Sequence, residues 1–303
     1  MKSIKGICPI IATPFTKTGK VDYDSFENLV RVLVQGGCHA VALFGIAGEY
    51  YKLSDEEAVK MAHITVDTCR KYGGTTIISV TQHSTETAVE RAKLYEDIGA
   101  DCLMLLPPFF LKPDAAALYD HMKAVGQAVS IPVMAQYAPE QTGVAIQPAV
   151  FAKLFNEVPN ICYYKIECKP AGSYVSTLLT ATENKVGAFI GNAGYQFIEC
   201  FDRGAIGAMP GCSMYDIYLK MYNEYTSGDR QAAINTHSIC ILPILNHIRQ
   251  NVEMIIKYEK RILQLRGIIA TDYCRHPTFA TDPVFDKLFN EHYERIMNLF
   301  VNL

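Results

Sequence analysis

Short apolar runs alternate with amphipathic stretches along most of this chain, and this alternation limits the possible folds more than any other feature. Residues 7–12 form the first apolar run, and Phe26, Leu29, Val30 and Leu33 follow at the spacing of one helix face. Further runs typical of strands lie at residues 39–44, 75–80, 102–106, 131–136, 161–167, 186–190 and 205–209. Strands separated by single helices pair in parallel, and eight such units predict a closed (β/α)8 TIM barrel.

After residue 209 the sequence contains only helical patterns, at residues 213–227, 230–250, 252–266 and 283–299. We therefore predict a barrel over residues 1–227 and a C-terminal helical extension over residues 228–303. We expect the extension to pack on the barrel, since no low-complexity linker separates the two. Helix start signals support the pattern, with a capping box at Ser54 and Glu57, an N-cap at Asp114, and prolines in the first turn at Pro148 and Pro283.

Composition and charge favour a small molecule as the partner. The chain has 303 residues and a formal net charge of −3, with its basic residues scattered, so we expect no nucleic-acid partner. No apolar run reaches the roughly 20 residues that span a bilayer, which predicts no membrane segment. The stretch at residues 1–6 lacks the apolar core of a signal peptide, which predicts a cytoplasmic location.

Cofactor signals are also lacking in the sequence. The 10 cysteines form neither a close pair nor a cluster with histidine at zinc spacing, so we expect reduced structural thiols and no bound metal. No glycine-rich phosphate loop follows the first strand, which argues against a nucleotide cofactor. We therefore predict that the chain needs no cofactor.

One lysine interrupts a strand that is otherwise apolar. Lys165 lies between Tyr163 and Ile166, in a run where a buried strand would exclude an ammonium group. Loss of water favours the neutral amine, which attacks carbonyl carbons and forms Schiff bases. A lysine at a strand end whose head reaches water would give the same pattern, so the strand motif alone leaves both interpretations open.

In barrels of this kind the site lies at the carboxyl ends of the strands. The turn after the second predicted strand, Gly45-Ile46-Ala47-Gly48-Glu49, is framed by glycines, and its backbone N–H groups could hold a carboxylate. His83 follows the third strand, where it either lines the mouth of the barrel or faces solvent. The other residues that follow strand ends, and that we take as candidates for binding, are Phe110, Gln136, Tyr137, Gly191 and Met209.

The order of these motifs resembles the dihydrodipicolinate synthase and N-acetylneuraminate lyase family. The shared features are Gly45-x-x-Gly48-Glu49, Pro107-Pro108-Phe109-Phe110-x-x-Pro113, Pro139-x-x-Thr142-Gly143, a lone strand lysine at Lys165, and Gly191-Asn192. The resemblance covers nearly the whole chain. It implies a class I enzyme that binds pyruvate or another 2-oxo acid through an imine with Lys165. It also implies a homo-oligomer, usually a tetramer, that requires no metal.

The chain departs from the family pattern at the residues that handle the carboxylate and the proton. Ile46 and Ala47 stand where the family carries threonine or serine, which leaves mainly backbone donors for a carboxylate. Gln136 stands in place of the relay tyrosine, and Tyr137 lies one residue later, on the opposite face of the strand. We expect Tyr137 either to reach a neighbouring site or subunit, or to pack. An amide orients a water or a hydroxyl but does not act as an acid or base at neutral pH.

Two further departures concern the substrate. Phe110 replaces the second tyrosine of the family's relay, and Gln141 replaces the arginine with which the synthases hold an aspartate-derived substrate. Both changes argue against synthesis of dihydrodipicolinate. They favour a substrate whose distal end is uncharged, such as a deoxy sugar acid.

Glu167 is our candidate to replace the missing relay. Tyr163, Lys165 and Glu167 alternate along one strand and should point the same way, into the barrel. Glu167 could then take a proton from a substrate hydroxyl, directly or through a water held by Gln136. The alternative is that Glu167 only pairs with Lys165 or with Lys169.

The leading hypothesis is a pyruvate-class aldolase that reversibly cleaves a 2-oxo-3-deoxy sugar acid into pyruvate and an aldehyde. Lys165 would form the iminium, Gln136 and Glu167 would handle the hydroxyl, and Phe110 would wall the pocket. Three alternatives stay open: a dehydratase on a 2-oxo-3-deoxy acid, a condensation like that of dihydrodipicolinate synthase, and a non-catalytic binder of 2-oxo acids.

Overall fold

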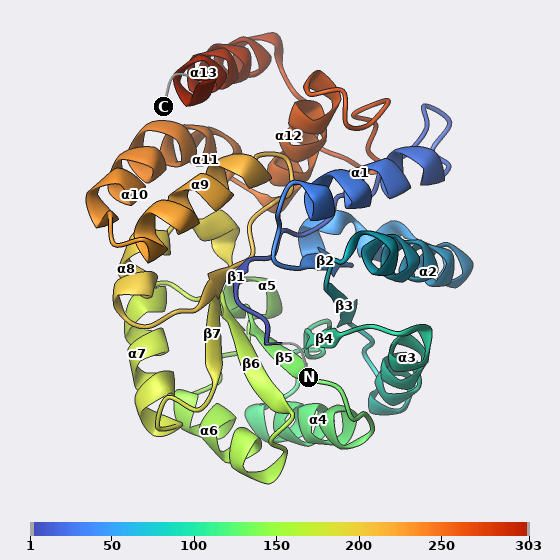
Figure 1. Cartoon of the computed structure of the whole chain (residues 1–303). Coiled ribbons are helices and arrows are strands. Elements are labelled where there is room, and N and C mark those ends of the chain that lie inside the picture. The colour runs from blue at the N-terminus through green and yellow to red at the C-terminus, as the bar shows by residue number, and fades with distance from the viewer. Residues whose placement is uncertain (1–2, 302–303) are drawn as a thin grey trace.

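The computed structural model describes residues 3–301, so residues 1, 2, 302 and 303 of the predicted segments lie outside the described residues. Eight parallel strands form one sheet in the order β1-β8-β7-β6-β5-β4-β3-β2, and a parallel bridge between Ile10 and Ala42 joins its first and last strands. Figure 1 shows the strands at the centre with helices around them, which confirms the predicted TIM barrel. The strands are β1 (Gly6–Ile7), β2 (Val41–Leu43), β3 (Thr76–Val80), β4 (Cys102–Leu105), β5 (Val133–Tyr137), β6 (Ile161–Ile166), β7 (Gly187–Ile190) and β8 (Gly207–Ala208).

Helices follow the strands in the predicted alternation. They are α1 (Tyr23–Gln35), α2 (Asp55–Tyr72), α3 (Thr85–Ile98), α4 (Ala115–Gln127), α5 (Pro139–Thr142), α6 (Pro148–Glu157), α7 (Ala171–Ala181), α8 (Phe197–Asp202) and α9 (Tyr215–Thr226). The predicted start signals are confirmed. Ser54 and Glu57 form a reciprocal capping box on α2, Asp114 caps α4, and Pro148 opens α6.

The first strand is shorter than predicted. β1 ends at Ile7, and the chain then continues along β8 through single hydrogen bonds such as the one from Cys8 N to Ala208 O at 2.9 Å. Pro9 lacks an amide hydrogen and therefore cannot donate to a regular ladder at this point.

Apolar side chains fill the inside of the barrel. The inner cluster contains residues from seven strands or their flanking segments: Ile4, Cys8, Ile10, Ala40, Ala42, Ile77, Cys102, Met104, Met134, Phe189 and Met209. A larger cluster packs the outer faces of the strands against the helices. Because the interior is closed by these side chains, a ligand can enter only at the strand ends, as in other packed barrels.

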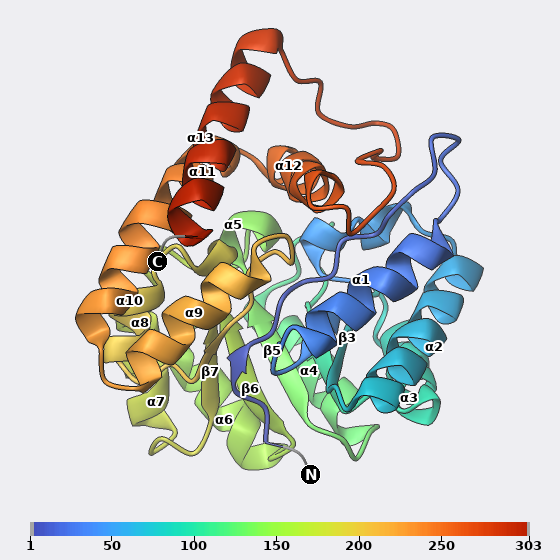
Figure 2. The ribbon, with the colours of Figure 1, turned by 45° about the horizontal axis from the view of Figure 1, so that its top comes forward.

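The chain after α9 is helical, as predicted. It forms α10 (Arg230–Thr236), a π-helical turn η4 (His237–Ile241), α11 (Leu242–Ile248), α12 (Val252–Leu265) and α13 (Pro283–Val301). Figure 2 shows α12 above the ends of the strands, with α13 rising beyond it. Asp282 caps α13 by accepting hydrogen bonds from Val284 N at 2.9 Å and Phe285 N at 3.0 Å, which confirms the predicted start.

Two predicted absences can be compared with the structure. Within residues 3–301 no helix is both long enough and apolar enough to cross a membrane. The same part of the chain holds no group of three His, Cys, Asp or Glu side chains that could bind a metal ion. All 10 cysteines are free thiols, and all except Cys162 are buried, in agreement with the predicted structural role.

Candidate active site

A pocket opens at the carboxyl ends of β5, β6 and β8, and the lone strand lysine is part of its wall. Its empty volume is about 550 Å³, including the part open to solvent. The lining residues come from the barrel loops and from helix α12: Ile10, Ile46, Ala47, Gln136, Gln141, Lys165, Glu167, Asn192, Ala193, Met209, Pro210, Gly211, Val252 and Ile255. The predicted candidates Ile46, Ala47, Gln136, Lys165, Glu167 and Met209 thus lie in one cavity.

Lys165 is held in place by its strand. It lies near the end of β6, paired in register with Gln136 of β5 on one side and Phe189 of β7 on the other. Only 3% of its surface is exposed. Its Nζ atom lies 3.4 Å from Glu167 Oε1, an ion pair in a largely buried setting. The amine therefore points into the pocket beside a carboxylate, and not out toward bulk water.

Two donors orient the Glu167 carboxylate, and a third holds the Glu167 backbone. Gln136 Nε2 donates a hydrogen bond of 2.5 Å to Oε2, and the backbone N–H of Asn192 donates one of 3.2 Å to Oε1. The Asn192 side chain donates to the backbone oxygen of Glu167 at 2.9 Å. Tethered on both oxygens, the carboxylate cannot swing freely away from Lys165.

Gly191 leaves the space that Glu167 occupies. A Cβ atom at position 191 would lie 2.1 Å from Glu167 Cγ, so any larger residue would displace the carboxylate. The next three residues form the turn η3 (Asn192–Gly194), and all three have positive φ angles. Ala193 adopts this conformation at a steric cost, and Tyr218 of α9 supports it with a 2.6 Å hydrogen bond to Ala193 O.

The glycine-framed turn forms another side of the pocket. Ile46 and Ala47 line the cavity, at the start of a 3₁₀ turn, η1 (Ile46–Gly48). Gly45 and Gly48 are not among the lining residues but let the turn approach the segment after β1, since a Cβ on Gly48 would lie 2.8 Å from Ile11 O. Within the described chain, neither Ile46 N nor Ala47 N donates a hydrogen bond to the protein.

Three aromatic residues singled out in the sequence do not line this pocket. Phe110 is 78% exposed and does not wall the cavity, because the loop after β4 carries it outward. Tyr137 faces the helices, as strand period predicted, and stacks on Tyr174 with ring centroids 4.5 Å apart. It therefore packs and does not reach the pocket of its own chain. Tyr163 shares the inward face with Lys165, but its hydroxyl accepts a hydrogen bond from Ile4 N at 3.1 Å, deeper in the barrel.

Helix α12 covers one side of the pocket, and sequence reasoning missed this contribution. Val252 and Ile255 line the cavity from the first turns of α12. The amphipathic pattern predicted the helix but gave no sign of what its apolar face covers.

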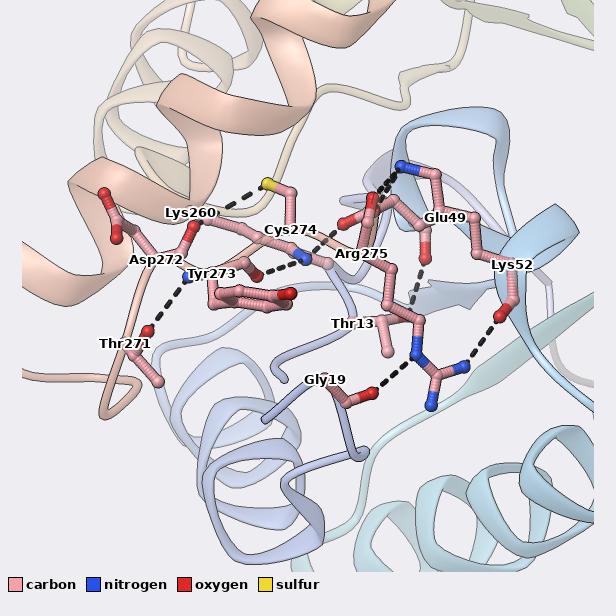
Figure 3. Close-up of polar contacts among 12 residues, drawn as sticks. Thr13, Gly19, Glu49, Lys52, Lys260, Thr271, Asp272, Tyr273, Cys274 and Arg275 are labelled. Carbon is pink, nitrogen blue, oxygen red and sulfur yellow. Dashed lines mark hydrogen bonds and ion pairs between the residues drawn. The ribbon is translucent and has the colours of Figure 1, made fainter. Parts of the chain in front are cut away.

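A buried ion pair attaches α12 to the glycine-framed turn (Figure 3). Lys260 of α12 donates to Glu49, which directly follows Gly48, and both side chains are fully buried. Lys52 contacts the other oxygen of Glu49 at 3.0 Å, and Lys260 also donates to Tyr273 O at 3.1 Å. Burial lowers the pKa of Lys260, while the neighbouring Glu49 carboxylate opposes that shift. The pair therefore joins two segments that both line the pocket.

A second, larger cavity adjoins the first. Ile46, Gln141 and Val252 line both cavities. His83 lies in the second one, where its ring meets Phe109 edge-to-face at a centroid distance of 4.9 Å. Phe109, rather than the neighbouring Phe110, is thus the aromatic residue of this loop that faces a cavity.

Known proteins resemble this chain over most of its length. The model of the dihydrodipicolinate synthetase family matches residues 3–288. A 4-hydroxy-tetrahydrodipicolinate synthase from Aliarcobacter butzleri is 29% identical over 240 residues, which cover 78% of this chain and 80% of that protein. An L-2-keto-3-deoxyarabonate dehydratase from Azospirillum brasilense is 25% identical over 279 residues, 90% of this chain and 88% of that protein.

A solved structure supports the fold. The crystal structure of dihydrodipicolinate synthase from Rhodopseudomonas palustris superposes with a TM-score of 0.89 and covers 96% of this chain and 97% of that chain, at 24% sequence identity.

Proposed function

This chain belongs to the dihydrodipicolinate synthetase family, and from that membership we propose that it is a Schiff-base lyase acting on 2-oxo-3-deoxy acids. One observation carries the proposal: a lysine at the end of β6 is buried in a pocket, 3.4 Å from a carboxylate that is tethered on both oxygens. Lys165 passes its proton to Glu167, and the free amine attacks the C2 carbonyl carbon of the substrate; Glu167 then returns that proton to the departing oxygen, and loss of water leaves an iminium. The Glu167 carboxylate stabilises the positive charge that forms on that nitrogen.

Glu167 is also the group that moves the proton. It lies beside the iminium nitrogen, and C3 of the substrate is two bonds from that nitrogen. Gln136 holds the carboxylate from the other side and is itself an amide, so it positions Glu167 or a water but does not exchange a proton. One carboxylate thereby takes the role that the family gives to tyrosines.

Cleavage of the C3–C4 bond is the first outcome. Glu167 takes the proton of the C4 hydroxyl, the C4 oxygen becomes an aldehyde oxygen, and the electrons of the C3–C4 bond move into the iminium to form an enamine. The proton then returns from Glu167 to C3, and water hydrolyses the imine to release pyruvate. Because one carboxylate both takes and returns the proton, the cycle needs no second acid.

Dehydration is the second outcome, and one observation favours it. The relative that matches 90% of this chain is named as an L-2-keto-3-deoxyarabonate dehydratase. Here Glu167 takes a proton from C3 and returns it to the C4 hydroxyl, which leaves as water. The same residues serve both reactions, and the products distinguish them.

The carboxylate end of the substrate lies against the glycine-framed turn in this proposal. Ile46 and Ala47 supply their backbone N–H groups, and Gly45 and Gly48 keep the turn close to the segment after β1. Met209 forms the apolar wall opposite, and Gly191 makes room for Glu167. The predicted homo-oligomer and the cytoplasmic location remain proposals beside this one.

The test begins with pyruvate and borohydride, with intact mass as the readout and Lys165→Ala as the control. We expect an adduct of pyruvate size that the control lacks. Incubation with a 2-oxo-3-deoxy acid then separates the outcomes: release of pyruvate supports cleavage, and loss of water without pyruvate supports dehydration. An absent adduct with pyruvate and with larger 2-oxo acids would overturn the Schiff base. An adduct without turnover would instead favour the non-catalytic binder, and turnover only with pyruvate and an aspartate-derived aldehyde would favour condensation.

A further inference from the structure

We propose that the cavity adjoining the catalytic pocket receives the distal part of the substrate, and that the enzyme prefers a 4-hydroxy-2-oxo acid with an uncharged aromatic or apolar group beyond C4. This inference rests on the proposed function, because it takes the position of C2 from Lys165. It narrows the predicted class of substrates, which included polyhydroxylated sugar acids.

The two cavities adjoin at three residues. Ile46, Gln141 and Val252 line both of them. A substrate with C2 bound to Lys165 and its carboxylate against Ile46 and Ala47 must extend its remaining atoms through this junction. The adjoining cavity is the larger of the two, with an empty volume of about 1150 Å³ including the part open to solvent.

Four of the nine residues that line the adjoining cavity carry aromatic rings. Tyr50 and Tyr51 line it with ring centroids 5.6 Å apart, and Phe109 and His83 face it from the loops after β4 and β3. Burial raises the pKa of Tyr50, and that of Tyr51 to about 12, so both phenols are uncharged at neutral pH. The faces of such rings favour another flat apolar group, and a ring face offers no strong hydrogen bond to replace the water that a sugar hydroxyl would lose.

The charge in this cavity disfavours a second carboxylate on the substrate. Glu253 is the one carboxylate among the lining residues, and neither lysine nor arginine is among them. An anionic tail would meet a like charge without a cation to offset it. An uncharged tail meets no such penalty.

Gln141 supplies the second, independent observation. Its Oε1 atom is buried and has no hydrogen-bond partner among the described residues. A buried acceptor without a donor is costly, and Gln141 lies at the junction of the two cavities. In the dehydration reaction a hydroxyl on C4 of the substrate would donate to this oxygen, while its own oxygen accepts the proton from Glu167, at the point where the substrate passes from the pocket into the aromatic cavity. The structure thus calls for one hydroxyl at the junction and apolar atoms beyond it.

The test compares three acids on the unmodified full-length chain: 4-hydroxy-2-oxo-4-phenylbutanoate, a six-carbon 2-oxo-3-deoxy sugar acid, and 4-hydroxy-2-oxopentanedioate. Loss of substrate is followed by chromatography, with both pyruvate and dehydrated acid counted. Cleavage of the phenyl acid gives pyruvate and benzaldehyde, while dehydration gives water and the unsaturated acid. We expect kcat/KM for the phenyl acid to exceed that for the sugar acid by at least about tenfold, with the diacid lowest. An equal or higher value for the sugar acid or the diacid would overturn the inference.

Two variants test whether the adjoining cavity causes the preference for the phenyl acid. Phe109→Ala should lower kcat/KM for the phenyl acid about tenfold, mainly through KM. Leu111→Ala is the matched control, because Leu111 lies in the same loop, is 84% exposed and lines neither cavity. Equal effects of the two substitutions would contradict the assignment.

Pyruvate trapping by borohydride separates the two proposals. Pyruvate is too short to enter the adjoining cavity, so both variants should form the adduct as the unmodified chain does. If the unmodified chain forms no adduct, the proposed function fails. If the adduct forms but the phenyl acid is not preferred, only the present inference fails.

Discussion

Replacing Lys260 with methionine tests whether the buried ion pair fixes helix α12 over the pocket. Lys260 and Glu49 are both fully buried, and they come from segments 211 residues apart in the sequence. Methionine fills a similar volume but removes the positive charge. The Glu49 carboxylate would then remain in the interior with Lys52 as its remaining cation, at 3.0 Å.

The expected loss of stability follows from the buried Glu49 carboxylate, which loses one of its cationic partners. Removing one partner of a buried ion pair costs about 3–5 kcal/mol, because the other charge stays buried. Lys52 still offsets part of the Glu49 charge, so we expect the lower end, about 3 kcal/mol. With a urea m-value of about 3 kcal/mol/M, the unfolding midpoint should fall by roughly 1 M.

The matched control is Lys257→Met in the same helix. Lys257 contacts Asp272 at 3.3 Å, but about a quarter of its side chain is exposed (25%), so water replaces the lost contact. We expect this substitution to cost less than about 1 kcal/mol. Urea unfolding followed by circular dichroism measures both variants under one set of conditions. Equal midpoints for Lys260→Met and Lys257→Met would refute the view that the buried pair is a major anchor.

Three further predictions concern the site and its pH dependence. Glu167→Gln should keep the borohydride-trapped pyruvate adduct but lower turnover at least about 100-fold, since the amide cannot move a proton; unchanged turnover would contradict its role. Gly191→Ala should lower turnover by a similar factor and keep the adduct, because the new Cβ would lie 2.1 Å from Glu167 Cγ. Normal kinetics would show that the turn after β7 shifts to make room for the methyl group. Burial lowers the pKa of His121 to about 4, so the folded state keeps this ring neutral, and its contribution to stability is present above about pH 6.5 and is lost as the pH falls toward 4. His121→Leu should remove up to about 3 kcal/mol of this pH dependence, measured as urea midpoints between pH 7 and pH 4.5.

Local periodicity was enough to predict the barrel and part of the pocket. The strand residues Lys165 and Glu167 are two apart, so the side-chain period of a strand places them on one face whatever the rest of the chain does. The sequence analysis also left open that Glu167 only forms an ion pair with Lys165 and moves no proton. The structure has that ion pair inside the pocket, so pairing and chemistry are compatible at this position.

The contribution of α12 could not be predicted, because it depends on contacts between distant segments. On an isolated helix Lys260 looks like one more charged residue beside Lys257 and Arg261, and nothing local marks it as buried. Its partner Glu49 lies in the loop after β2. Only the packing of the C-terminal helices on the barrel brings the two together.

The prediction that Phe110 of the loop after β4 walls the pocket was wrong for a related reason. Phe109 and Phe110 are identical in type and adjacent in sequence, and the chain has no regular period there that decides which one faces a cavity. The path of the loop decides it, and it turns Phe109 toward His83 and leaves Phe110 exposed.

The same helix that anchors to Glu49 also forms a wall of the pocket, and this links stability to substrate binding. Ile255 and Lys260 are five residues apart on α12, about 7.5 Å along the helix axis at 1.5 Å per residue. An apolar pair of similar volume in place of Lys260 and Glu49 need not be less stable, since burying two charges is itself costly. It would, however, lose the directional contact that sets how far α12 reaches over Ile46. The double variant, Glu49→Leu with Lys260→Met, should therefore keep its urea unfolding midpoint but show a raised KM. Each single variant should show both a lower midpoint and a raised KM.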